Sequence, residues 1–76
     1  MSQRLPALKP KDVLRVLQRA GFFIHHTGGS HYILKHPDHP AKRVTIPYHK
    51  RDLKRKTLTS IIEQSGLSNE DFLELL

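Results

Sequence analysis

A helical pattern of hydrophobic residues opens the chain, in the stretch KPKDVLRVLQRAGF at residues 9–22. Apolar side chains recur at helical spacing and share one face, while Arg15 and Arg19 fall on the opposite face. The apolar positions are Val13, Leu14, Val16, Leu17 and Ala20. This spacing predicts an amphipathic helix, and Gly21 is a typical residue for its end.

The pattern then changes to that of β-strands. The segments FFIHHT and HYILKH are rich in aromatic and β-branched residues and are separated by the turn GGS, which predicts a hairpin over residues 22–36. The segment RVTIP places Val44 and Ile46 on one face, so we expect a third strand that ends at Pro47. The intervening segment PDHPAK contains two prolines and an aspartate, and we expect it to be a loop.

Two more helices are predicted in the last part of the chain. From about Thr57 the apolar residues return to helical spacing, and Gly66 ends the repeat. Ser68 and Asp71 are spaced as in a capping box before the apolar end FLELL, so we expect a short third helix.

This order of elements predicts an α+β fold. Three consecutive strands with short connections form an antiparallel sheet, and the flanking helices are expected to cover one of its faces. The 76 residues suffice for a single domain, 1–76. The chain contains no cysteine, which excludes a disulfide framework and a thiolate metal site.

Charge is divided unevenly along the chain, whose formal net charge is +6. All 13 Lys and Arg residues lie in residues 1–56, whereas residues 57–76 hold four acidic residues and no basic one. Such asymmetry favours a polyanionic partner, of which nucleic acids are the commonest. A membrane partner is disfavoured, because the basic residues do not lie opposite an apolar stripe on one long helix. No membrane span or signal peptide is recognisable, so we expect a cytoplasmic protein.

The densest group of basic residues spans residues 42–56, which hold seven of the 13 positive side chains. It leads into the second predicted helix, whose N-terminal N–H groups also attract anions. Two interpretations remain open: a phosphate-binding surface, or a solvated face that keeps the protein soluble. The charge imbalance of the run favours RNA or DNA. Tyr48 and His49 are placed to stack on a base, although Tyr48 fits a packing role equally well.

Six histidines raise the question of a metal site. His25 and His26 are adjacent on a predicted strand, so we expect their side chains to point to opposite faces. The most closely spaced group, His36 and His39 with Asp38, lies in the proline-flanked loop and lacks a fourth ligand. We therefore predict no metal site.

His31 differs from the other histidines because it follows Gly28, Gly29 and Ser30. The glycines remove side-chain bulk, their N–H groups can point at a phosphate, and the serine adds a hydroxyl donor. Imidazole changes protonation near neutral pH and suits general acid–base catalysis, although a histidine at a strand edge is more often plain surface. RNA supplies its own nucleophile, the 2′-hydroxyl, so its cleavage requires phosphate binding and proton transfer but no metal. The candidates for a second proton-transfer group are Lys35, Tyr48 and His49.

Several motifs, in order along the chain, resemble the HicA family of bacterial toxins. The resemblance rests on RAGF at the end of the first helix, on GSH followed by an apolar strand and HP, on RVTIP leading into HKRDL, and on TLTSIIEQSGLS. It covers nearly the whole chain, and GSH is its most specific part. Gly28 stands where the family often has a basic residue, and Lys56 stands where it often has a glycine before Thr-Leu.

The resemblance implies a fold like that of the double-stranded-RNA-binding domain and the activity of a metal-independent mRNA interferase, with His31 as the catalytic residue. It also implies a HicB-type antitoxin that covers the toxin, and no small-molecule cofactor. The residues expected to contact RNA are Gly28, Gly29, Ser30, Lys35, Arg43, His49, Lys50, Arg51, Lys54, Arg55 and Lys56. A non-catalytic RNA-binding module of the same fold is the alternative, whereas a purely protein-binding domain leaves the basic run unexplained.

Overall fold

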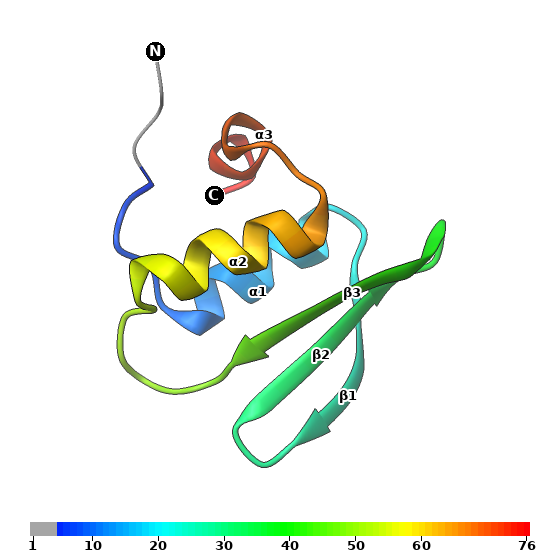
Figure 1. The fold of residues 1–76 in the computed structure, drawn as a ribbon, viewed down its shortest axis with the longest axis horizontal. Helices are drawn as coiled ribbons and strands as arrows, with labels where there is room; N and C mark the ends of the chain where they lie inside the picture. Colours follow the sequence, from blue (N-terminus) through cyan, green and yellow to red (C-terminus); the bar gives the residue numbers. More distant parts are fainter. Residues whose placement is uncertain (1–4) are drawn as a thin grey trace.

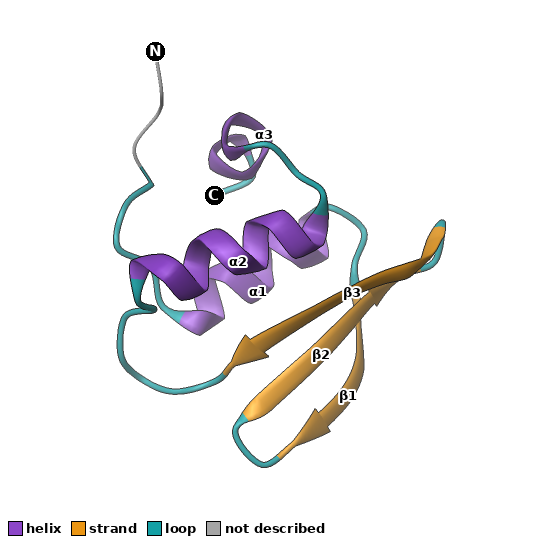
Figure 2. Cartoon of the chain, in the orientation of Figure 1, coloured by secondary structure: helices purple, strands orange, loops and turns teal. Residues whose placement is uncertain are grey.

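The computed structural model describes residues 5–76, and its elements follow the predicted order (Figure 1). The helices are α1 (Pro10–Arg19), α2 (Arg55–Ser65) and α3 (Asn69–Glu74), and the strands are β1 (Phe23–Gly28), β2 (His31–His36) and β3 (His39–Pro47). The strands form one antiparallel sheet in the order β1-β2-β3, so β1 and β3 are its edges. Helices α1 and α2 lie over one face of this sheet, and α3 lies beyond them (Figure 2). The predicted α+β fold is therefore confirmed.

The helix ends follow from their local sequences. At the start of α1 the backbone N–H of Lys9 donates a hydrogen bond to the Asp12 carboxylate (3.0 Å). Gly66 ends α2 with φ +78°, a left-handed conformation that favours glycine. Ser68 caps α3 by accepting a hydrogen bond from the N–H of Asp71 (3.0 Å), as predicted. The start of α2 lies two residues earlier than predicted.

One hydrophobic core lies between the sheet and the helices. Its fully buried apolar side chains are Val13, Val16 and Leu17 of α1, Leu34 of β2, Val44 and Ile46 of β3, Leu58 and Ile61 of α2, and Phe72 of α3. The guanidinium of Arg19 donates to the carbonyl of Leu75 (2.7 Å) and ties α1 to the end of α3. The C-terminal helix therefore closes the core. Of the helices in residues 5–76, none combines the length and apolar character needed to cross a membrane.

The turn between β2 and β3 is shorter than predicted. Only Pro37 and Asp38 separate the two strands, and β3 begins at His39. The expectation of a loop over residues 37–42 is therefore wrong. Pro40 lies within β3 without breaking the sheet, because an edge strand has one side that makes no ladder hydrogen bonds.

A β-bulge interrupts the pairing of β1 with β2 between Ile24 and His26 and leaves His25 without a partner on β2. An extra residue of this kind breaks the alternation of side chains along the strand. His25 and His26 consequently line the same pocket, and the expectation that they point to opposite faces is wrong.

Candidate nucleic-acid interface

The β1–β2 hairpin places His31 at one end of the sheet. Gly29 and Ser30 form a two-residue turn, and Gly29 has φ +57°, which glycine adopts without strain. His31 is the first residue of β2 and pairs with Gly28 on β1 and with Pro47 on β3. Its side chain is exposed, and a methyl group at Gly29 would meet no non-neighbouring atom within 4 Å. The ring therefore lies beside an uncrowded turn.

Side-chain alternation along β2 decides which face His31 occupies. Leu34 is fully buried and Tyr32 packs against the same core, so His31 belongs to the opposite face, which the helices leave open. Tyr32 stacks on Tyr48, with ring centroids 4.4 Å apart and an interplanar angle of 14°. The N–H of Tyr48 also donates to the carbonyl of Ser30 (2.6 Å). Tyr48 thus anchors the end of β3 to the turn, which is the packing role that its sequence context allowed.

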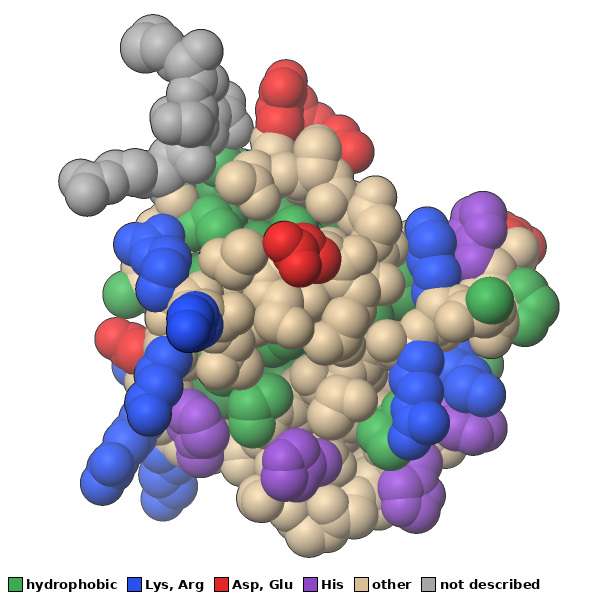
Figure 3. Space-filling view, in the orientation of Figure 1, with side chains coloured by type: hydrophobic (Ala, Val, Ile, Leu, Met, Phe, Trp, Pro, Cys, Tyr) green, Lys and Arg blue, Asp and Glu red, His purple; other side chains and the backbone are tan. Residues whose placement is uncertain are grey.

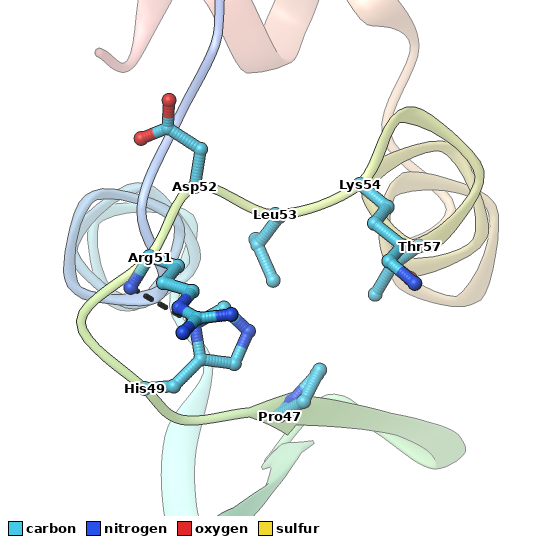
Figure 4. Close-up of a pocket in the computed structure, with 7 residues that line it drawn as sticks. All are labelled: Pro47, His49, Arg51, Asp52, Leu53, Lys54 and Thr57. Carbon is cyan, nitrogen blue, oxygen red and sulfur yellow. Dashed lines mark hydrogen bonds between the residues drawn. The ribbon is translucent and has the colours of Figure 1, made fainter.

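A pocket of about 510 Å³ lies between the end of β3, the loop that follows and the start of α2 (Figure 4). Its lining residues are Pro47, His49, Arg51, Asp52, Leu53, Lys54 and Thr57. Pro47 is the β3 partner of His31, so this pocket adjoins the strand position of that histidine. The Nδ1 atom of His49 accepts a hydrogen bond from the N–H of Arg51 (3.1 Å), which assigns the proton of a neutral ring to Nε2. His49, Arg51 and Lys54 therefore offer hydrogen-bond donors to an anion here.

The start of α2 adds to the positive potential of this pocket. Lys54 is the N-cap residue; its side chain makes no capping hydrogen bond, and the first turn of the helix holds no acidic residue. The N–H groups of that turn keep their partial positive charge beside Lys54 and Lys56. The guanidinium of Arg55 instead donates to the carbonyl of Leu5 (2.9 Å) and ties the N-terminal segment to α2.

Lys42, the first residue of the basic run, also has a structural position. A methyl group at Gly66 would lie 2.6 Å from its Nζ atom, so the ammonium lies at the C-terminal end of α2. That end carries the partial negative charge of the helix dipole, which a cation stabilises. The basic run therefore contains two kinds of cation. Lys42 and Arg55 make contacts within the fold, whereas others, such as Lys50 and Arg51, are exposed.

Sequence reasoning missed two lysines that lie next to the basic run. A pocket of about 320 Å³ is lined by Lys9, Lys11, Tyr48, His49 and Lys50. The N–H of Leu53 donates to the carbonyl of Leu8 (2.8 Å), which holds the start of α1 against the loop after β3. Lys9 also forms an exposed ion pair with Asp52 (3.6 Å). Lys9 and Lys11 are far from His49 in the sequence and meet it only through tertiary packing, so no local motif predicts the contact.

A third pocket, of about 250 Å³, lies on the open face of the sheet. It is lined by His25, His26, Ile33, Lys35 and Arg43. Lys35 and Arg43 are direct partners on β2 and β3, and within residues 5–76 neither forms an ion pair with an acid. The structure thus brings these two predicted RNA contacts together, in a pocket distinct from that of His49, Arg51 and Lys54.

His36 has a structural role. Its Nδ1 atom accepts from the N–H of Asp38 (3.1 Å), so Nε2 carries the proton of the neutral ring and donates to the carbonyl of Ala20 (3.2 Å). Its ring also meets that of Phe22 edge-on, with centroids 5.1 Å apart. In the part of the chain that the structure describes, no three His, Cys, Asp or Glu side chains are grouped so as to hold a metal ion.

The surface divides by charge as the sequence predicts. In Figure 3, acidic side chains lie over α3 at the top and over α2 in the centre, with others at the left and right edges, whereas Lys, Arg and His side chains gather around the sheet and around the loop between β3 and α2.

Comparison with known proteins identifies one family. The family model described as the HicA toxin of bacterial toxin–antitoxin systems matches residues 10–67, which run from the start of α1 to just beyond α2. The match includes the hairpin of His31 and the basic run and leaves out α3. No curated protein matches the chain.

Proposed function

The chain belongs to the HicA toxin family, whose members are toxins of toxin–antitoxin systems and in general cleave messenger RNA, and from this premise we propose a specific mechanism. The protein is an endoribonuclease in which His31 transfers a proton at the scissile phosphodiester, and no metal ion takes part. Because messenger RNA is the substrate, we place the activity in the cytoplasm.

The reaction uses the nucleophile that RNA carries. The 2′-oxygen attacks the adjacent phosphorus, the bond from phosphorus to the 5′-oxygen breaks, and the products are a 2′,3′-cyclic phosphate and a 5′-hydroxyl. One group must take the proton of the 2′-hydroxyl and another must protonate the leaving 5′-oxygen, and His31 performs one of these transfers. Cationic side chains stabilise the charge that develops on the phosphoryl oxygens.

The observation that carries this proposal is the position of His31. Its exposed ring lies beside the open turn at Gly29, and its β3 partner Pro47 lines the pocket that contains His49, Arg51 and Lys54. RNA whose backbone is held by those donors can continue past the His31 imidazole, where the scissile phosphodiester would lie. This position supports the proposal, because 2′-hydroxyl cleavage requires both phosphate binding and proton transfer.

A HicB-type antitoxin is the protein partner that the family implies, and we propose that it inhibits the toxin by covering the hairpin of His31. A bound protein at this exposed turn would exclude RNA from the imidazole.

The test compares purified wild-type protein with His31→Ala in excess EDTA. We expect the wild type to cleave RNA but not DNA of the same sequence, and to arrest growth when it is induced. His31→Ala should fold and bind RNA with wild-type affinity but do neither. Equal cleavage by both proteins would rule out His31 as the catalytic residue. RNA binding without cleavage by the wild type would instead favour a non-catalytic RNA-binding module.

A further inference from the structure

We propose that His26 is the second proton-transfer residue of the cleavage reaction, and that the pocket of His26, Lys35 and Arg43 holds an RNA phosphate next to the scissile one. This inference rests on the function proposed above. Cleavage by the 2′-hydroxyl moves two protons at two different oxygens, so His31 alone leaves one transfer without a residue.

Gly28 connects the two histidines. It is the β1 partner of His31, and a methyl group at Gly28 would lie 3.1 Å from Nε2 and 3.6 Å from Cδ2 of His26. Since directly paired residues of an antiparallel sheet have Cβ atoms about 5 Å apart, Nε2 of His26 lies within about 9 Å of the Cβ atom of His31. This upper limit allows the two rings to flank one phosphate, each at a hydrogen-bond distance of about 3 Å from one oxygen.

The lack of a side chain at Gly28 leaves the His26 ring unhindered in this position. A methyl group 3.1 Å from Nε2 of His26 would be closer than ordinary van der Waals contact, so the ring would have to move by a few tenths of an ångström. The glycine that stands in place of the basic residue often found in the family thus has a physical reason here. It leaves room for the imidazole of His26 next to His31.

Charge in the neighbouring pocket indicates an anionic ligand. Lys35 and Arg43 lie directly opposite each other on β2 and β3, and like charges in such a position destabilise a sheet. Within residues 5–76, neither cation forms an ion pair that would relieve this repulsion. His26 lines the same pocket, so a phosphate bound between Lys35 and Arg43 lies next to its ring.

The other groups near the hairpin are less suited to this transfer. Both ring nitrogens of His36 make hydrogen bonds within the fold, and Tyr48 is stacked on Tyr32. The ring of His25 lies edge-on to that of Phe23, with centroids 6.4 Å apart. His26 is the histidine that both lines the cationic pocket and approaches the β1 partner of His31.

The two histidines divide the reaction between them. One imidazole takes the proton of the 2′-hydroxyl as the 2′-oxygen bonds to phosphorus. The other, as imidazolium, gives its proton to the 5′-oxygen as the bond from that oxygen to phosphorus breaks. Each ring ends with the protonation state that the other began with, and no external oxidant, reductant or metal is required.

The experiment uses two RNA substrates of the same sequence, one with the natural 5′-oxygen at the scissile bond and one with sulfur at that position. A thiolate leaves without protonation, so this substrate restores the rate of a variant that lacks the general acid but not of one that lacks the general base. On natural RNA, we expect His26→Ala and His31→Ala each to lower the cleavage rate by about 100-fold or more. On the sulfur substrate, one of the two variants should recover most of the wild-type rate.

His39→Ala is the matched control, because His39 is exposed and lies at the opposite end of β2 from His31. It should cleave both substrates at the wild-type rate. A wild-type rate for His26→Ala on natural RNA would overturn the proposal, and so would recovery of both variants or of neither on the sulfur substrate. If wild-type protein cleaves neither RNA, the proposed ribonuclease function itself fails, which is a separate outcome.

Discussion

The two edge strands of the sheet differ in what they bury. β3 lies under α2 and contributes Val44 and Ile46, both fully buried, to the core. β1 contributes no buried residue, and even its apolar Phe23 and Ile24 are exposed. The contrast shows that the fold depends on β3 and the helices, whereas β1 and its turn can hold groups for chemistry.

The substitution expected to have the largest effect is His31→Ala. We expect the cleavage rate to fall about 1,000-fold, which corresponds to about 4 kcal/mol of transition-state stabilisation. Because the side chain is exposed, the free energy of unfolding should change by no more than about 0.5 kcal/mol. Single-turnover kinetics and urea denaturation measure the two quantities. A large loss of stability would contradict the division between fold and chemistry.

The converse test is Leu34→Ala, three positions further along the same strand. Leu34 is fully buried, so we expect the free energy of unfolding to fall by about 3 kcal/mol. At a temperature and denaturant concentration where the variant remains folded, its cleavage rate should stay close to that of the wild type. Loss of activity in a fully folded sample would show that packing on the helix side of the sheet controls the site on its open face.

Gly28→Ala probes the space between His26 and His31. The added methyl group would lie 3.1 Å from Nε2 of His26, and displacement of that ring should lower the cleavage rate about 10-fold, or about 1.4 kcal/mol. The same substitution in a His26→Ala background should have little further effect, because the two changes act on one group. Additive losses in the double variant would show that Gly28 acts independently of His26.

The smallest effect is expected for Lys54→Ala, because Lys54 is one of several residues that line the pocket at the start of α2. RNA binding should weaken by less than 10-fold, and the slope of log affinity against log salt should fall by about 1. Lys42→Ala is the control, because Lys42 lies at the C-terminal end of α2. It should lower stability by about 0.5 kcal/mol and leave the salt slope unchanged. Equal changes in both slopes would place RNA on both ends of α2.

Sequence predicts the features that depend on local patterns. The helical repeat, the stop at Gly66 and the cap at Ser68 all appear in the structure, because each is decided by residues within a turn or two. The sequence does not predict the start of β3 at His39, because proline is typical of loops. A strand tolerates Pro40 here only because β3 is an edge strand.

The site is less predictable because it depends on pairing and tertiary contact. Alternation alone puts His25 and His26 on opposite faces, and the bulge that overrides it has no clear sequence signal. Lys9 and Lys11 line a pocket together with Tyr48, His49 and Lys50 only because α1 packs against the loop after β3. The prominence of His31, in contrast, follows from its glycine turn and is visible in the sequence.

A strand without buried residues also has consequences for evolution. Most substitutions in natural proteins are limited by a stability threshold, below which the folded population becomes too small for function. Residues 23–28 contribute nothing buried, so changes there cost little of that margin. Lineages carrying this fold can therefore exchange residues of β1 without compensating mutations in the interior.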